Sequence, residues 1–493
     1  MTDDKKEFII ESVREKEQLC YITCMEAYCI GENQVYSMLA IEERFKYVGT
    51  AEKYLDAAKA AMNFINTRKR TDEEGIYWTL ADAAAGKPSY YDEICMYAGA
   101  SGIICFLLSL YEDTQDAAYL DEAKEAGCYL EYRWRKRREL KRNFSPYAFS
   151  TGWGGASFAL LQMYLVTKDE HYRALVEEIL DQAVRDAIPV KEGEGYYWST
   201  YPGIVGTAGT ILVILNAAEK LGREDWKEFA VKAGRYFLTR GRDMGNGMIC
   251  YTGVDPTYFG AGKDYIDPNF PMGTGGIGFL MLKLYEVSGK KEFLDAVKGV
   301  PEYMDTVAVK MRAGKLLPHA LPDRPDLFYL GYCHGPAGTN RFYYELYKFS
   351  GDAKYRHEIE ELVKGLEATG APEKRSAGYW NTENICCGTA GLLNMYLGLW
   401  AAFGEEHDLE YARRCAKVLM DTAVFEDGAE GGQASWKFAL DRVAPERLST
   451  PIGFLDGAAG IGSVLLQMAR AERGDFHTVR AVDDPFPERK LEK

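Results

Sequence analysis

The chain has 493 residues, of which 47% are hydrophobic and 13% aromatic, and this composition supports a large core and excludes an intrinsically disordered protein. With 74 Asp and Glu against 59 Lys and Arg, the formal charge of −15 argues against a nucleic-acid partner and against a polybasic membrane contact. No apolar run approaches the roughly 18 to 20 residues of a membrane-spanning helix, and the charged start MTDDKKEF is unlike a secretory signal. We therefore expect a cytoplasmic protein without membrane insertion.

The N-terminal 46 residues precede the repeats described below and are predicted to form a helical extension. Cys20, Cys24 and Cys29 lie in this extension at spacings that are typical of buried apolar thiols on a helix. The 11 cysteines of the chain are odd in number and scattered, as expected of free thiols in a reducing compartment. Residues 47–475 are predicted to form a single repeat domain, and residues 476–493 a C-terminal tail.

One pattern, a G-x-x-G step followed by an apolar run, occurs seven times in the predicted domain. The copies are GASGIICFLL from Gly99, GWGGASFALL from Gly152, GTAGTILVIL from Gly206, GGIGFLMLKL from Gly275, GPAGTNRFYY from Gly335, GTAGLLNMYL from Gly388 and GAAGIGSVLL from Gly457. These runs are apolar nearly all round, which predicts helices that are buried on every side. The stretches before them, such as AEKYLDAAKAAMNFI, EHYRALVEEILDQAV and KKEFLDAVKGVPEYM, have apolar residues at i, i+3, i+4 and i+7, which predicts surface helices.

Each repeat is thus predicted to be an outer amphipathic helix, a loop and an inner buried helix. Closing the inner helices into a ring buries all of them, whereas an open solenoid would expose an apolar face at each end. The predicted fold is all-α: an α/α toroid, or double ring of seven inner and seven outer helices. The glycines allow crowded helix ends to approach one another, and the inner N-termini then point into one mouth, which favours anions.

Two adjacent repeats carry potential metal ligands directly before the first glycine. The sequence YCHG supplies Cys333 and His334, and ICCG supplies Cys386 and Cys387. On neighbouring inner helices at the same level, these side chains can converge, and thiolate and imidazole are the ligands that zinc prefers. The alternative is a set of small buried residues without a metal, but the occurrence of both pairs at the same step of the repeat favours the metal site.

Seven G-x-x-G hairpins with these Cys and Cys-His pairs resemble the lanthionine synthetase C-like family, the zinc-dependent cyclases of lanthipeptide biosynthesis and their relatives. The resemblance covers roughly residues 47 to 475. It implies that Cys333, Cys386 and Cys387 bind zinc, with Cys387 in the place of the family's usual histidine, as in the Cys-Cys-Gly variant of the sixth repeat. It also implies a peptide or small-molecule thiol as substrate, activated for Michael-type addition to a dehydroamino acid with formation of a thioether. Three thiolates leave a charge of −1 on the zinc site, so a bound substrate sulfur should be more nucleophilic than beside a neutral histidine.

The sequence departs from the cyclases at three positions that serve proton transfer in that family. Pro202 stands where the cyclases have an aspartate, Thr274 where they have a histidine, and Tyr329 where they have an arginine. His334 lies beside the expected metal, so it is our candidate for the catalytic acid or base, with a role as ligand or as a supporting hydrogen-bond partner as alternatives.

Two other functions remain open on the sequence. A non-catalytic peptide-binding or thiol-binding protein on the same scaffold would explain the three departures. A carbohydrate-active toroid enzyme would need two carboxylates across the mouth. Its candidates are Asp92, Glu93, Asp264, Asp267 and Asp456. Such an enzyme has no use for the aligned cysteines.

Overall fold

The computed structural model describes residues 49–80, 91–136, 139–141, 145–191, 194–252, 265–322, 325–426, 432–476 and 480–490. The predicted N-terminal extension with Cys20, Cys24 and Cys29, and also Asp264, lie outside the described residues.

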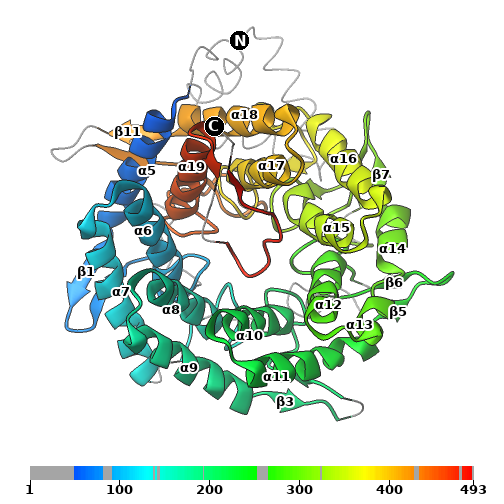
Figure 1. Ribbon diagram of the computed structural model, residues 1–493. Coiled ribbons are helices and arrows are strands. Elements are labelled where there is room, and N and C mark those ends of the chain that lie inside the picture. The colour runs from blue at the N-terminus through cyan, green and yellow to red at the C-terminus, as the bar shows by residue number, and fades with distance from the viewer. Residues whose placement is uncertain are drawn as a thin grey trace, which may run out of the picture.

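Within the described residues, seven helices of 15 residues each surround a common axis and form the inner ring (Figure 1). They are α6 (Ala100–Thr114), α8 (Trp153–Thr167), α10 (Thr207–Leu221), α12 (Thr274–Ser288), α15 (Pro336–Ser350), α17 (Thr389–Phe403) and α19 (Ala458–Glu472). These helices are apolar nearly all round because they lie between the axis and the outer helices. In α17, for example, 12 of the 15 residues are buried.

The outer ring consists of helices with one apolar face. They are α5 (Ala51–Asn66), α7 (Ala117–Arg135), α9 (Glu170–Arg185), α11 (Glu224–Gly234, continued by the short helix η2, Arg235–Thr239), the pair α13 (Lys291–Asp295) and α14 (Val300–Val307), α16 (Ala353–Glu367) and α18 (Glu406–Thr422). In α9 the buried residues are Tyr172, Leu175, Val176, Ile179, Leu180 and Ala183, which is the spacing of a single helix face. The predicted double ring of seven inner and seven outer helices is confirmed.

Two details of the predicted repeats were wrong. The outer helix of the fifth repeat is divided into α13 and α14, because Pro301 cannot continue a helix and instead occupies the first turn of α14. The inner helix of the fourth repeat is capped by Gly273 rather than by Gly275. Gly273 allows the close approach that the turn needs, since a Cβ there would lie 1.9 Å from the Asp267 carbonyl oxygen.

Short strand pairs connect the helices. In the part of the chain that the structure describes, five antiparallel hairpins follow outer helices: β1–β2 (Lys69–Asp72, Gly75–Trp78), β3–β4 (Ile188–Pro189, Tyr196–Tyr197), β5–β6 (Arg242–Asp243, Ile249–Cys250), β7–β8 (Val309–Lys310, Lys315–Leu316) and β11–β12 (Val424–Glu426, Gln433–Ser435). The others are the parallel pair β9–β10 (Phe328–Tyr329, Tyr379–Trp380) and the antiparallel pairs β13–β14 (Phe438–Ala439, Leu448–Ser449) and β15–β16 (Asp475–Phe476, Arg489–Lys490).

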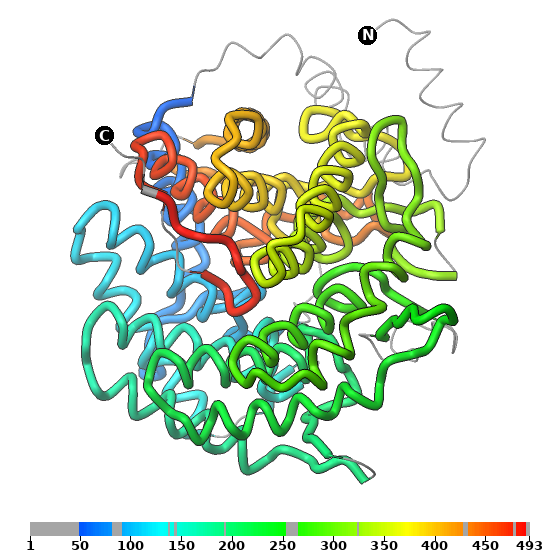
Figure 2. The backbone as a smooth tube through the Cα atoms, turned by 45° about the vertical axis from the view of Figure 1, so that its right-hand side comes forward, coloured from blue at the N-terminus to red at the C-terminus, as the bar shows by residue number. Residues whose placement is uncertain are grey.

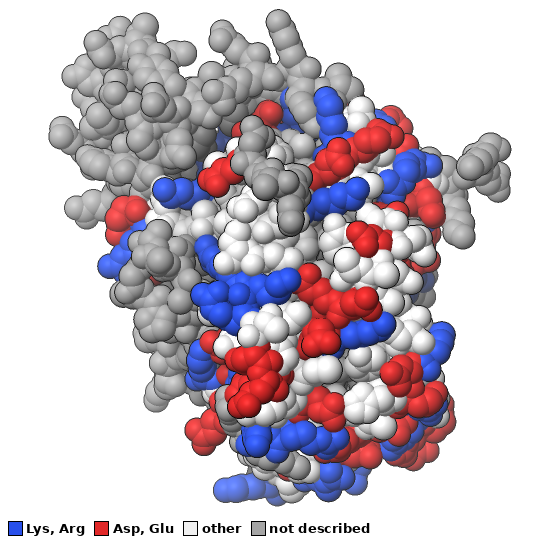
Figure 3. All heavy atoms as spheres, turned by 90° about the vertical axis from the view of Figure 1, so that its left-hand side faces the viewer, with Lys and Arg blue, Asp and Glu red and all other residues white. Residues whose placement is uncertain are grey.

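The ring closes where α19 packs against α5 and α6, and the C-terminal segment 480–490 then runs back into the ring (Figure 2). On the face drawn in Figure 3, groups of Lys and Arg lie next to groups of Asp and Glu. Among the described residues, none of the helices is long and apolar enough to cross a membrane.

Candidate metal centre

The loops that lead into the inner helices are joined by backbone hydrogen bonds at one level of the ring. The second residue before the capping glycine donates its N–H to the corresponding residue of the next repeat. Cys333 donates to Cys386 (2.9 Å), Cys386 to Leu455 (2.9 Å), Leu455 to Tyr97 (2.8 Å) and Tyr97 to Ser150 (2.9 Å). This chain of bonds fixes Cys333 and Cys386 side by side, although they are 53 positions apart in the sequence.

A second contact aligns the same two loops. Strand β9, which leads to Cys333, pairs in parallel with β10, which leads to Cys386, and Leu330 donates its N–H to the Trp380 carbonyl at 3.1 Å. The loops of the fifth and sixth repeats are therefore aligned with each other directly before α15 and α17 begin.

The three predicted thiols meet at this place. The sulfur atoms of Cys333, Cys386 and Cys387 all lie within 4.8 Å of one another, and those of Cys333 and Cys387 are 3.4 Å apart. Cys333 and Cys386 are buried, each with 8% exposure, whereas Cys387 is half-buried. The cluster thus reaches the surface on the Cys387 side.

Burial and the mutual hydrogen bonds of the thiols control their charge. Donation from Cys333 and Cys387 lowers the pKa of Cys386 well below its usual range, whereas burial raises the pKa of Cys333 well above it. Burial also raises the pKa of Asp456 to about 7, and the negative charge of Cys386 adds to this effect. Within the cluster, the thiolate form is therefore favoured at Cys386 and disfavoured at Cys333.

The imidazole of His334 lies beside the thiol cluster and is buried. Its Nδ1 is 2.8 Å from Oδ2 of Asp267, which comes from the loop before α12. Asp267 also accepts the backbone N–H of Asn269 at 2.9 Å, so the carboxylate is itself held in place. This contact places the Asp267 carboxylate against the His334 ring at ion-pair distance, without hydrogen-bond geometry.

Sequence reasoning missed a second histidine in this region. The ring centroid of His319 lies 4.1 Å from that of His334 and 4.4 Å from that of Tyr329. His319 lies in the irregular segment between β8 and β9, where no repeat motif marks it. The signal that could have indicated His319 is the presence of a histidine in a long connection that leads back to the mouth of the ring.

The three departures from the cyclase pattern have clear places in the structure. The Tyr329 hydroxyl accepts a hydrogen bond from Nε of Arg442 (3.1 Å), an arginine between β13 and β14. Thr274 is the first residue of α12, and its hydroxyl accepts from the Tyr251 N–H (3.1 Å) and donates to the Tyr251 carbonyl (2.9 Å). With Gly273 as the cap, Met272 rather than Thr274 precedes the glycine, and Pro202 offers no titratable group.

Three of the four described carboxylates proposed for a carbohydrate-active enzyme have other partners, whereas no ion pair holds the buried Asp456. Asp92 is completely buried and forms an ion pair with Arg133 at 3.0 Å. Glu93 is bonded to Lys141, and Asp267 lies at ion-pair distance from His334. A pair of free carboxylates across the mouth is not present among these described residues.

The comparisons with known proteins agree with this architecture. The family model of the lanthionine synthetase C-like proteins matches residues 90–479, and the chain belongs to this family. Among solved structures, nisin cyclase aligns with a TM-score of 0.55 at 14% identity, over 79% of this chain and 91% of that chain, which shows a shared fold. No curated protein matches the chain in sequence.

Two carbohydrate-active enzymes align more loosely. They are the α-1,6-mannanase from Salegentibacter sp. (13% identity, TM-score 0.40, over 85% of this chain and 99% of that chain) and the cellobiose 2-epimerase from Bacillus thermoamylovorans (11% identity, TM-score 0.42, over 85% of this chain and 100% of that chain).

Proposed function

We propose that this protein is a zinc-dependent enzyme that activates a thiol for Michael-type addition to a dehydroamino acid or a similar electrophile. The observation that carries the proposal is the convergence of Cys333, Cys386 and Cys387 at one mouth of the toroid. The substrate would be a peptide or a small-molecule thiol, in keeping with membership of a family of lanthipeptide cyclase-like proteins.

The donor set fits zinc. In a tetrahedral site with Zn–S bonds of about 2.3 Å, neighbouring sulfur atoms are roughly 3.8 Å apart. The distance of 3.4 Å between the sulfur atoms of Cys333 and Cys387 is close to this value. Three protein ligands leave a fourth position open, and the half-buried Cys387 marks the side from which a substrate can enter. Zinc held there would supply Lewis-acid activation of the substrate thiol.

The residues of the chain would then assist the addition. The substrate sulfur attacks the β-carbon, a C–S bond forms, and the electron pair of the C=C bond moves to the carbonyl as an enolate. The inner-helix N-termini at this mouth favour that negative charge. A proton added at the α-carbon completes the thioether, and we assign its delivery to His334, which lies against Asp267.

The second candidate function is a non-catalytic protein that binds peptides or thiols at the same site. Pro202 and Met272, the residue before the capping Gly273, favour it, because neither can transfer a proton at the positions where the cyclases have an aspartate and a histidine. The carbohydrate-active alternative is disfavoured by the ion pair of Asp92 and by the contact of Asp267 with His334.

The test is metal content followed by turnover. We expect about one zinc per chain in the purified wild type, and loss of the metal in Cys333→Ala and Cys386→Ala. Cys415→Ala is the matched control, because Cys415 is a completely buried thiol of α18 away from the cluster. Full zinc occupancy in both cluster variants would exclude the assignment. Thiol addition to dehydroalanine peptides then separates the enzyme from a binding protein, which would hold zinc without turnover.

His334→Gln tests the assigned proton donor. Because glutamine preserves a hydrogen-bonding side chain but cannot carry the proton, we expect zinc to remain and turnover to fall by about 10²-fold to 10⁴-fold. The measurement is steady-state thioether formation by mass spectrometry, with zinc content determined on the same samples. Unchanged turnover would rule out the catalytic role.

A further inference from the structure

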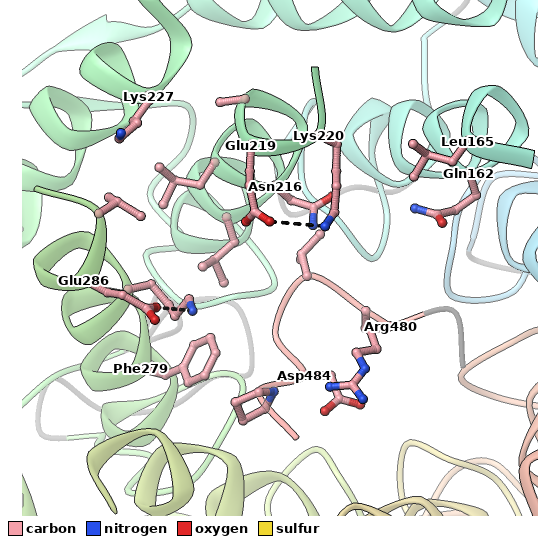
Figure 4. Close-up of a pocket in the computed structure, with 18 of the residues that line it drawn as sticks. Gln162, Leu165, Asn216, Glu219, Lys220, Lys227, Phe279, Glu286, Arg480 and Asp484 are labelled. Carbon is pink, nitrogen blue, oxygen red and sulfur yellow. Dashed lines mark hydrogen bonds and ion pairs between the residues drawn. The ribbon is translucent and has the colours of Figure 1, made fainter. Parts of the chain in front are cut away.

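The C-terminal segment 480–490 lies inside the ring. Strand β16 at its end pairs with β15, and Nη1 of Arg489 donates to the Trp400 carbonyl at 3.0 Å. The Phe486 ring packs on Gly398 of α17, with its centroid 4.9 Å from that of Tyr344 of α15. The segment also forms one wall of a cavity of about 780 Å³, where Arg480 and Asp484 lie next to each other (Figure 4).

One residue of this segment reaches the loop that carries a metal ligand. Asp483 has 1% exposure, and its Oδ2 accepts a hydrogen bond from the hydroxyl of Tyr332, the residue directly before Cys333. Its Oδ1 accepts from Nη1 of Arg341 at 2.8 Å. Asp483 and Tyr332 are 151 positions apart in the sequence, so the contact joins the end of the chain to the fifth repeat.

Tyr332 is held from several sides by this arrangement. The Arg341 guanidinium lies 4.8 Å from the centre of the Tyr332 ring, and the Phe270 ring packs edge-on at 5.8 Å. Arg341 continues the network through Asn394 of α17 (3.1 Å), which donates to Gln467 of α19 (3.2 Å). The orientation of Tyr332 is therefore tied to three inner helices and to the C-terminal segment.

The polar contacts of Asp483 indicate that it orients Tyr332 and does not only fill space inside the ring. A segment that only closed the axis would be served as well by apolar residues, because a buried ion pair loses solvation energy that well-packed hydrophobic residues do not. Hydrogen bonds to a carboxylate, in contrast, fix both distance and direction. Residues that orient ligand-bearing groups in this way typically change metal affinity by about 10-fold to 100-fold when they are removed.

We propose that Asp483 is a positioning residue of the metal centre, which holds Tyr332 and through it the thiol of Cys333, so that the C-terminal segment is part of the zinc site's support. This inference rests on the proposed zinc site. It makes the affinity for the metal at the ring mouth depend on contacts made inside the ring.

The first experiment measures zinc affinity by competition with a chromophoric chelator, and thermal unfolding of the metal-free protein. Tyr332→Phe removes the hydrogen bond to Asp483 without unpairing Arg341, and Asp483→Asn keeps the shape of the side chain. We expect each variant to bind zinc about 10-fold more weakly, and the double variant to lose less than the sum of the two single effects, since both act on the hydrogen bond between Tyr332 and Asp483.

Phe486→Leu is the matched control, because it loosens the same segment at Tyr344 and Gly398 and not at Tyr332. It should lower the melting temperature and leave zinc affinity unchanged. Folded Tyr332→Phe protein with wild-type zinc affinity would overturn the inference and leave the zinc site intact. A wild type that binds no zinc would overturn both, and this result appears before any variant is made.

A second experiment needs no substitution. If the segment supports metal binding, zinc must in return stabilise the segment, because coupling between two sites is reciprocal. We expect amide hydrogen exchange in residues 480–490 to slow when zinc is added to the full chain. Exchange in this segment that is the same with and without zinc, while the cysteine loops respond, would overturn the inference.

Discussion

The three thiols of the candidate site differ in how far they are exposed to solvent. Cys333 and Cys386 are buried and joined through their backbones, so they form the fixed part of the cluster. Cys387 is half-buried, and its backbone N–H is held by the side chain of Asn384 at 2.7 Å. It is therefore the thiol best placed to face an incoming substrate.

Replacing Cys387 with histidine tests what the third thiol contributes. Cys387→His restores the Cys-His-Gly sequence that is usual in the family and changes the charge of a zinc site from −1 to 0. We expect zinc to remain at about one per chain and thiol addition to slow by about 10-fold, because the substrate sulfur would keep less negative charge. The measurements are zinc analysis and the thiolate-to-cobalt absorption of the cobalt-substituted protein, which should lose intensity. Faster addition in Cys387→His would contradict this account.

The convergence of the three thiols could be predicted because they stand one or two positions before a repeated glycine, and the ring brings these positions of adjacent repeats together. Arg442 and His319 could not be predicted in this way. Both lie in connections between helices, whose paths are set by tertiary contacts rather than by a periodic pattern. Asp267 was noted only as a possible carbohydrate-enzyme carboxylate, because its contact with His334 joins loops of two different repeats.

At the scale of the helix, the glycine that caps each inner helix is a steric requirement. A Cβ on Gly388 would lie 2.0 Å from the Thr382 carbonyl oxygen, so the loop before α17 could not close. We expect Gly388→Ala to lower the free energy of unfolding by about 2–4 kcal/mol and to reduce zinc binding, since Cys387 is the neighbouring residue. Urea denaturation and zinc analysis measure the two effects.

Gly351→Ala is the control for that substitution. Gly351 ends α15 with φ of +65°, and a Cβ added there would meet no atom within 4 Å, so only backbone strain of about 1 kcal/mol is expected. Equal effects of the two substitutions would show that close packing at the cap is not the reason for the glycine.

In the fourth repeat, the capping glycine could not be predicted from the sequence. The stretch GTGGIG contains two overlapping G-x-x-G steps, and only packing against Asp267 selects Gly273 as the cap.

The buried carboxyl group of Asp408, in the first turn of α18, makes the stability of the folded protein depend on pH. Burial raises the pKa of Asp408 from 3.8 to about 7. Because the pKa is higher in the folded than in the unfolded state, the stability contributed by the protonated carboxyl is complete below about pH 4 and is lost as the pH rises through about 7. Asp408→Asn cannot ionise, so we expect it to be about 1–3 kcal/mol more stable than the wild type at pH 8 and nearly equal to it at pH 4. Thermal unfolding at both pH values measures this, and a larger gain at pH 4 would contradict the assigned sign.

At the scale of the whole molecule, the toroid depends on the contact between its last and first repeats. Arg470 of α19 has 1% exposure, and its guanidinium bonds to Asp113 of α6 at 3.0 Å and to the Ser109 carbonyl at 3.1 Å. These bonds span more than 350 positions of the sequence, so they form only after the ring has closed. The sequence predicted closure from the apolar inner helices, but nothing in the repeat pattern identified the residues of the seam.

Arg470→Met separates ring closure from the chemistry of the mouth. Arg470→Met removes the buried partner of Asp113, which keeps only its ion pair with the more exposed Arg473 at 3.3 Å, so we expect a loss of about 1–3 kcal/mol in the free energy of unfolding. Arg413→Met is the matched control, because the Arg413 side chain is 40% exposed in its pair with Glu472 and should contribute less than about 1 kcal/mol. Since the thiols are fixed by loops on the fifth and sixth repeats, zinc content at low temperature should remain that of the wild type in both variants. Loss of zinc from folded Arg470→Met would show instead that the seam and the metal centre are coupled through the ring.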